Sequence, residues 1–197
     1  MGKPKLKEVT QFPPIHSTPK CLEVDVKIVC ALLEFAYKTP DSAGLCGIGI
    51  DAATYLSASD GCTALRWTRH CGALSDYKNK FWPRYYCETQ LKVAKAINRP
   101  VALAWNEFDD QKFLDVNGVF SMTPQGIRSM EPVGIDPAYL SRLTKVTAAF
   151  DRPNLDNPQC VALMAAAGPM DPILFEVRGK INAHPMDAEI VIMPYRL

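Results

Sequence analysis

The chain has 197 residues, of which 48% are hydrophobic, and a formal net charge of +1. This length suits one domain of ordinary size or two small ones, and the hydrophobic content argues against a disordered chain. A net charge so close to zero excludes a strong overall attraction to nucleic acid or to a membrane, so any such contact must come from a local patch.

The seven cysteines form no Cys-x-x-Cys pair, and the N-terminus has no secretory signal pattern. We therefore expect reduced thiols in a cytoplasmic protein. Cys62, His70, Cys71 and Cys87 match no common zinc-ligand spacing, and we predict neither a metal nor a cofactor. No apolar run approaches the roughly 20 residues of a membrane-spanning helix.

The first elements predicted along the chain are an arm and a helix. Residues 1–20 are rich in lysine and proline, which predicts an extended basic arm with one edge strand. A contact of this arm with DNA phosphates is an alternative to a solvated tail. From Val24 to Lys38, apolar residues recur at three- and four-residue spacing, which predicts an amphipathic helix that Thr39-Pro40 ends.

Three strand-like runs follow, at residues 45–50, 54–58 and 63–67. Asp60-Gly61 separates the last two, and Asp-Gly between strands is a strong hairpin signal. Asp60 could be a catalytic carboxylate, but its role in the turn already accounts for its presence.

The middle of the chain predicts a polar loop over residues 68–82 and a second helix from about Cys87 to Ile97. Strands are predicted at Val101–Trp105 and Phe113–Phe120, and a break of the second strand at Asn117-Gly118 is the alternative. Asp136-Pro137 then supplies the N-cap and first residue of a third helix, which ends near Phe150. Its inward face is expected to comprise Leu140, Leu143, Thr147 and Phe150. Three strands close the chain, at 160–165, 173–177 and 189–193, with a long loop between the last two.

Single helices between runs of strands predict an α+β fold with helices on one face of antiparallel sheets. The sequence has no Walker-type loop and no G-x-G-x-x-G motif, and nothing in it assembles a nucleophile, a base and an orienting group. We therefore expect a protein that is not an enzyme. Polar side chains converging in a deep cleft would favour the alternative, an enzyme on an unrelated α+β fold.

Two segments resemble the bacterial sliding clamp family, the DNA polymerase III beta subunit. Met193 to Leu197 match the Met-Pro-x-Arg-Leu ending of that family, after an apolar strand. Ala58 to Leu65 match in part its Ala-Thr-Asp-Gly-His-Arg-Leu segment, with Ser59 for Thr, Cys62 for His and one extra residue before Leu65. The resemblance implies a DNA-clamp-like fold over residues 21–197. The stretch near 68–125 is then an insertion in one domain, or the chain holds about one and a half clamp domains.

In the family, the two segments meet as the pocket for the linear motifs of polymerases and other clamp clients. The resemblance thus implies a non-catalytic clamp of DNA replication or repair. The implied peptide-binding residues are Asp60, Gly61, Leu65, Val191, Met193, Pro194, Tyr195, Arg196 and Leu197. The implied DNA-binding residues are Lys92, Lys95, Arg99, Arg142 and Lys145, which would contact phosphates without reading sequence.

Three alternatives stay open. In the first, the basic residues are solvated helix faces with no ligand, and in the second, the last residues are a structural cap on a terminal strand. The chain is also much shorter than a three-domain clamp, which favours a stand-alone adaptor or inhibitor that binds protein partners without encircling DNA. A closed ring would instead require a symmetric homo-oligomer.

Overall fold

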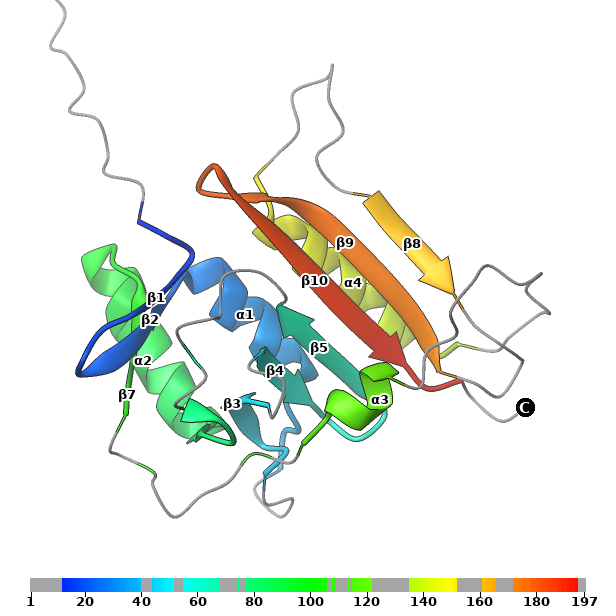
Figure 1. Ribbon diagram of the computed structural model, residues 1–197, viewed down its shortest axis with the longest axis horizontal. Coiled ribbons are helices and arrows are strands. Elements are labelled where there is room, and N and C mark those ends of the chain that lie inside the picture. Colours follow the sequence, from blue (N-terminus) through cyan, green and yellow to red (C-terminus); the bar gives the residue numbers. More distant parts are fainter. Residues whose placement is uncertain are drawn as a thin grey trace, which may run out of the picture.

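The computed structural model describes residues 12–39, 44–51, 55–67, 74, 77–105, 108, 113, 115–121, 135–151, 161–165 and 172–194. These residues contain four helices and ten strands, arranged as in Figure 1. The helices are α1 (Val26–Phe35), α2 (Arg84–Ile97), α3 (Asn117–Ser121) and α4 (Pro137–Ala149).

Seven strands form the main sheet, in the spatial order β6–β3–β4–β5–β10–β9–β8, and each is antiparallel to its neighbours. Their bounds are β3 (Gly47–Ile50), β4 (Leu56–Ser59), β5 (Thr63–Trp67), β6 (Phe81–Pro83), β8 (Val161–Ala165), β9 (Ile173–Ile181) and β10 (His184–Ile192). A second antiparallel sheet has the order β1–β2–β7, with β1 (Ile15–Ser17), β2 (Cys21–Val24) and β7 (Val101–Ala104). The α+β class with antiparallel sheets is therefore confirmed.

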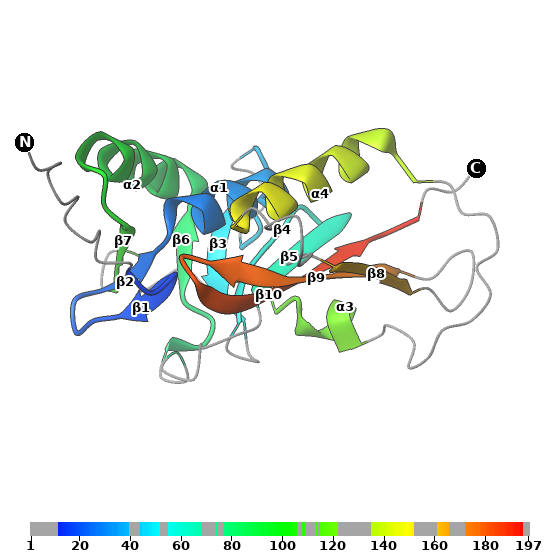
Figure 2. The ribbon, with the colours of Figure 1, turned by 90° about the horizontal axis from the view of Figure 1, so that it is seen from above.

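The three longer helices lie on one side of the sheets and the short α3 lies on the other, as Figure 2 shows. α1 is the central helix of this layer, since it contacts α2, α4 and strands β3 to β5. Asp25 caps its first turn, where its carboxylate accepts a hydrogen bond from the Lys27 amide at 2.8 Å. Because helices flank α1 on both sides, its buried residues spread over most of its circumference: Ile28, Val29, Ala31, Leu32, Leu33 and Phe35.

The centre of the main sheet is built from two similar units. α1 is followed by β3, β4 and β5, and α4 is followed by β8, β9 and β10. The innermost strands, β5 and β10, pair antiparallel with Ile190 opposite Leu65, and α1 packs against α4. Both helices begin at an aspartate N-cap, Asp25 in α1 and Asp136 in α4. The two units therefore have the same order of elements and meet at the antiparallel pair β5 and β10.

The face of the sheet opposite the long helices carries a small second core. It consists of Ala64, Phe81, Phe113, Val116, Phe120 and Val191. Two glycines of β3 make room for its aromatic rings. A Cβ on Gly49 would lie 2.1 Å from Cγ of Phe113, and one on Gly47 would lie 2.7 Å from Cζ of Phe81. The alternation of glycine with isoleucine in β3 thus reflects the packing of these rings on the strand.

Several local predictions are wrong. The predicted strand Phe113–Phe120 contains the start of α3 instead, with the Asp115 carboxylate accepting from the Asn117 amide at 2.9 Å. The long loop expected before the last strand is absent: β9 and β10 are longer than predicted and a two-residue turn joins them. Phe81 and Trp82, assigned to a polar loop, belong to β6.

The third predicted helix is present as α4, with its predicted N-cap Asp136, but its inward face differs from the prediction. Phe150 is buried and Leu143 packs against the core, as predicted, but Leu140 is 41% exposed and Thr147 is exposed. Val146 and Ala149 are buried in their place. In α4, Arg142 faces the β4–β5 hairpin and Val146 faces the core. This orientation of the helix places Leu140 and Thr147 at the surface.

The described elements of the stretch 68–125 contribute to both sheets and to the layer of long helices. Its strand β6 pairs with β3, its strand β7 pairs with β2, and its helix α2 packs against α1. Within the predicted arm, β1 is an edge strand of the smaller sheet, while residues 1–11 lie outside the described residues. Among the helices that the structure describes, none is long and apolar enough to cross a membrane.

Candidate functional site

The turn between β4 and β5 is organised by the Asp60 carboxylate. Oδ1 of Asp60 accepts hydrogen bonds from the Cys62 amide at 3.0 Å and from the Thr63 amide at 2.7 Å. The Thr63 hydroxyl donates to the same oxygen at 3.0 Å. Gly61 supplies the left-handed backbone of the turn, with φ of 89°. The predicted Asp-Gly hairpin and the turn role of Asp60 are both confirmed.

Arg142 of α4 joins this turn from a distant part of the sequence. Its Nη1 donates to Oδ2 of Asp60 at 2.5 Å and to the Thr63 hydroxyl at 2.6 Å. The guanidinium also lies 5.1 Å from the ring centre of Tyr139 and 5.8 Å from that of Phe35. The Asp60 and Arg142 side chains are only 13% and 18% exposed, so this ion pair is largely shielded from water.

Tyr139 reaches the same turn one helical turn before Arg142. A hydrogen bond with the Cys62 thiol, together with partial burial, raises the pKa of Tyr139 to about 12. The phenol therefore keeps its proton at neutral pH. Cys62 itself is an exposed thiol at the tip of the hairpin.

The end of β10 lies beside this hairpin. Ile192 is opposite Thr63 in the sheet, and the Met193 amide donates to the Cys62 carbonyl at 2.9 Å. The Met193 side chain is 39% exposed, and Pro194 is half-buried. The last described residues of the chain thus present apolar surface next to the turn.

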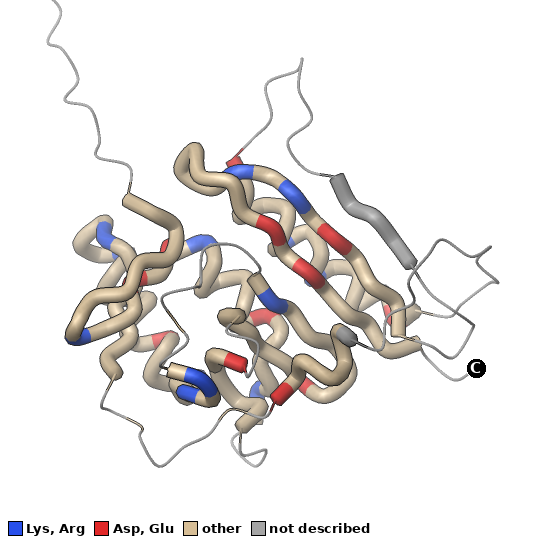
Figure 3. Tube along the Cα trace, in the orientation of Figure 1, with Lys and Arg blue, Asp and Glu red and all other residues tan. Residues whose placement is uncertain are grey.

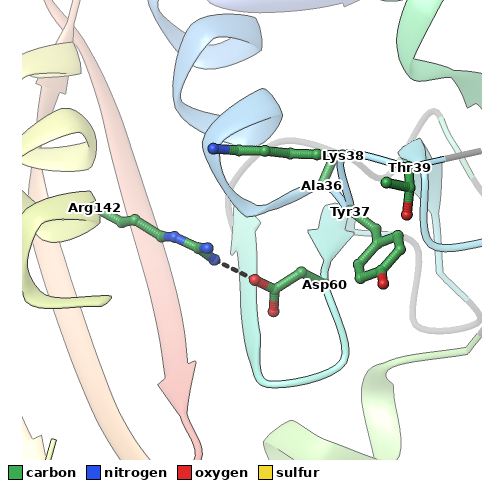
Figure 4. A pocket seen from close by; sticks show the side chains of 6 residues that line it. All are labelled: Ala36, Tyr37, Lys38, Thr39, Asp60 and Arg142. Atoms are coloured by element: carbon green, nitrogen blue, oxygen red, sulfur yellow. Dashed lines mark hydrogen bonds and ion pairs between the residues drawn. The ribbon is translucent and has the colours of Figure 1, made fainter. Parts of the chain in front are cut away.

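A pocket of about 290 Å³ opens on the helix side of the turn, as Figure 4 shows. It is lined by Ala36, Tyr37, Lys38, Thr39, Asp60 and Arg142. Four of these directly follow α1, so the pocket joins the end of α1 to the hairpin and to α4. Lys38 is exposed and has no ion-pair partner among the described residues, which leaves the pocket with excess positive charge. Its chemistry suits an anionic or hydroxyl-bearing group of a ligand.

The predicted peptide-binding residues fall into three groups. Asp60, Gly61 and Met193 lie together at the turn, with Pro194 next in the chain. The side chains of Leu65 and Val191 are fully buried in the two cores, so they support the sheet beneath this region without reaching its surface. Tyr195, Arg196 and Leu197 lie outside the described residues.

The predicted DNA-binding residues are divided between two helices. Lys92, Lys95 and Arg99 are exposed on and just after α2, and Lys145 is exposed on α4. Arg142 differs from these because it is bound to Asp60 and Thr63. Figure 3 shows charges of both signs along β9 and β10, so no basic surface of one sign covers these strands. DNA contact through the four exposed cations stays a prediction.

Sequence reasoning missed Tyr37, Lys38, Thr39 and Tyr139. The sequence pattern predicts the first three as the end of a helix, and only the tertiary contact with the β4–β5 hairpin makes them part of a pocket. Tyr139 could have been found from its place three residues before Arg142 on the same face of a helix.

The cysteines give no sign of a metal centre in the described part of the chain, which contains no cluster of three or more His, Cys, Asp or Glu side chains. Burial raises the pKa of Cys87 to about 12, so this thiol is protonated at neutral pH and is a poor ligand. His70 and Cys71 lie outside the described residues. In comparisons with known proteins, no protein-family model and no curated protein matches this chain.

Proposed function

We propose that the chain is a non-catalytic, sliding-clamp-like protein that binds a linear motif of polymerase-type partners in DNA replication or repair. The observation that carries the proposal is the contact between the end of β10 and the β4–β5 hairpin, where Met193 donates to Cys62 at 2.9 Å. These are the two segments whose sequences resemble the client pocket of the bacterial sliding clamp. Their contact within one sheet supports a peptide site built by a single chain.

The architecture supports the same proposal. Each half of the main sheet is a helix followed by three antiparallel strands, and the halves meet at β5 and β10. A clamp domain likewise repeats a helix-plus-strands unit twice. The long helices share one side of the sheets, which is the arrangement that the DNA-clamp-like proposal requires (Figure 2).

The chemistry of the turn supports a binding role over a catalytic one. Asp60 accepts three hydrogen bonds within its own turn and a fourth from Arg142. A carboxylate held in this way is a weak candidate for a general base, because its proton-accepting positions are already engaged. What remains accessible is apolar surface at Met193 and a cationic group at Lys38. Apolar anchors beside a charged rim suit a short peptide.

The proposal is tested with a fluorescent peptide carrying a clamp-binding motif of a bacterial DNA polymerase III. Anisotropy titrations compare the full chain with a variant lacking Tyr195 to Leu197 and with Met193→Glu. We expect each change to weaken binding at least about tenfold, because each removes apolar contact from the site. Arg178→Ala is the matched control, since Arg178 is an exposed residue of β9 whose guanidinium pairs with Glu176 on the same strand.

Thermal unfolding of the same variants separates binding from folding. If the deletion unfolds the protein, the tail is a structural cap, which is the alternative interpretation of these residues. If the peptide does not bind to the intact chain, or binds equally to Met193→Glu, the peptide site is not where we place it.

A specific observation favours the second candidate, an adaptor or inhibitor with this fold that encircles no DNA. Of the five predicted DNA-binding cations, Arg142 is committed to Asp60, and Lys92 and Lys95 flank an exposed apolar row described below. Sedimentation and duplex-DNA binding at low and moderate salt distinguish the candidates. A ring needs a symmetric oligomer and salt-sensitive binding, whereas the adaptor is a monomer without DNA affinity.

A further inference from the structure

The outer face of α2 exposes a row of apolar side chains. The described residues expose six large hydrophobic side chains, and three of them belong to this helix: Tyr85, Val93 and Ile97, at 65%, 50% and 61%. Val93 and Ile97 are four residues apart and so lie one turn above the other. Single exposed hydrophobic residues are ordinary, but several on one helix face indicate an interaction surface.

A basic row runs along the side of this apolar row. Lys92, Lys95 and Arg99 follow one another at three- and four-residue spacing, and all three are exposed. None of them has a carboxylate partner among the described residues. The only acidic residue of α2, Glu88, is already paired with Arg84 at 2.8 Å. The second half of α2 is therefore apolar on one edge and uncompensated positive on the other.

The surface is held on a rigid platform. The opposite face of α2 buries Tyr86, Cys87, Leu91 and Ala94. These contacts anchor the helix to β7 and α1, and Figure 2 shows α2 at the outer end of the helix layer. A helix packed in this way presents its exposed face without needing to rearrange on binding.

The composition of this face selects among possible occupants. A DNA backbone offers phosphates to the lysines but nothing apolar to Val93 and Ile97. The chain's own first eleven residues contain Lys3, Lys5 and Lys7 against one Glu8, so the basic row would repel them. A segment with apolar residues beside carboxylates complements both rows at once.

We propose that α2 docks an acidic amphipathic helix of a protein partner. The partner's apolar stripe lies on Tyr85, Val93 and Ile97, and its Asp or Glu side chains face Lys92, Lys95 and Arg99. At 1.5 Å per residue α2 is about 21 Å long, which matches about four turns of a partner helix. This surface is separate from the β4–β5 hairpin and goes beyond the peptide site proposed there.

The test uses two labelled synthetic helical peptides of about four turns. One carries a leucine stripe flanked on one side by glutamates, and the other has lysines in place of the glutamates. Anisotropy titrations use the full chain, Val93→Ser/Ile97→Ser, Lys92→Glu/Lys95→Glu and, as the matched control on α4, Lys145→Glu. Circular dichroism checks that each variant keeps its fold.

We expect the acidic peptide to bind the full chain at least about tenfold more tightly than the basic one. Val93→Ser/Ile97→Ser should weaken this binding about tenfold, and Lys92→Glu/Lys95→Glu should reverse the preference between the peptides. Lys145→Glu should bind as the unaltered chain does.

Three results overturn the proposal. The first is equal binding of both peptides, or of neither. The second is binding of duplex DNA that Lys92→Glu/Lys95→Glu abolishes and Val93→Ser/Ile97→Ser leaves intact, which assigns the face to nucleic acid. The third is a concentration-dependent dimer in sedimentation that Val93→Ser/Ile97→Ser dissociates, which assigns the face to a second copy of this chain.

Discussion

The β4–β5 and β9–β10 hairpins of the main sheet occupy equivalent places in its two units, and the β4–β5 turn borders the pocket described above. The β4–β5 turn docks on α4 through Asp60 and Arg142, and the β9–β10 turn docks beside α1, where the Asn182 amide group donates to Asp25 at 2.7 Å. Each unit thus places its turn against the helix of the other unit. The contacts are alike in position and differ in chemistry.

The difference lies in the residue after each helix. The C-cap residues, Ala36 after α1 and Phe150 after α4, have nearly the same backbone angles. After α4, Asp151 accepts from the Asn182 amide at 3.2 Å and from the Ala183 amide at 2.9 Å, so its carboxylate caps the turn directly. After α1, Tyr37 makes no such bond to the turn, and the pocket opens there.

The two turns differ in how much of their polar surface is used for folding. In the β9–β10 turn, the carboxylate of Asp151, just after α4, binds the turn amides, so these polar groups stabilise the fold. The β4–β5 turn contains its own carboxylate, Asp60, which also binds Arg142 of α4, and the end of β10 lies beside it. The second arrangement leaves accessible groups, which is why we place the peptide site there.

We expect the largest effect on stability from removing the Asp60 carboxylate of the β4–β5 turn. Asp60→Ala should lower the free energy of unfolding by about 3 kcal/mol, because it removes the acceptor of two amides and leaves the shielded Arg142 without its partner. Urea denaturation measures the loss.

Asp60→Asn is the matched control for this change. It keeps an oxygen for the turn and removes the charge, so it should cost about half as much. Equal losses from both variants would contradict this account and would mean that the ion pair, not the turn, dominates.

Removing the Asp151 carboxylate, which caps the β9–β10 turn, should lower stability less and should not affect peptide binding. Asp151→Ala removes the acceptor of the Asn182 and Ala183 amides and a 3.5 Å ion pair with Lys27. Because these groups are partly exposed, we expect a loss of about 1.5 kcal/mol in urea denaturation. Peptide affinity should be unchanged. A loss of affinity as large as that for Met193→Glu would show that the two turns are not functionally distinct.

The turns could be predicted from sequence to different degrees. Asp60-Gly61 is recognisable because Gly61 carries a positive φ and Asp60 satisfies its own turn, both local effects. The β9–β10 turn was missed because Asn182 and Ala183 both adopt positive φ without a glycine. A signal was present in the second half of β9, where Glu176, Arg178 and Lys180 occupy alternate positions that continue beyond the end of the predicted strand.

Helix prediction shows the same limit. The N-cap of α4 was predicted because Asp136-Pro137 is a local signal. The face of α4 that points inward was not predicted correctly, because it depends on the contact of Arg142 with Asp60, 82 positions away in the sequence. For α3, the spacing of Phe113, Val116 and Phe120 is helical, and the strand prediction overlooked it. The pocket depends wholly on such tertiary contacts and had no signal of its own.

A smaller pair of effects concerns backbone conformation in the two turns. Ala183 has φ of 65°, a region that favours glycine, so Ala183→Gly should raise the free energy of unfolding by about 1 kcal/mol. Gly61 has φ of 89°, so Gly61→Ala should lower it by about 1 kcal/mol. Thermal and urea unfolding of both variants measure the changes. Effects of the same sign would show that the backbone of one turn is not as described.

The smallest expected effect is a pH dependence of stability that comes from Tyr139, beside the β4–β5 turn. The hydrogen bond with Cys62 raises the pKa of Tyr139 to about 12, against an ordinary value near 10. The stabilising contribution of this hydroxyl is therefore fully present below pH 10 and is lost as the pH rises from about 10 to about 12. In the folded protein, the absorbance step of the Tyr139 phenolate, taken as the difference between the unaltered chain and Tyr139→Phe, should appear near pH 12. Cys62→Ala should move that step down toward pH 10, because it removes the group that holds the proton on the phenol. A step that stays in place in Cys62→Ala would mean that the thiol does not bind the phenol, and the first turn would then lose one of its links to α4.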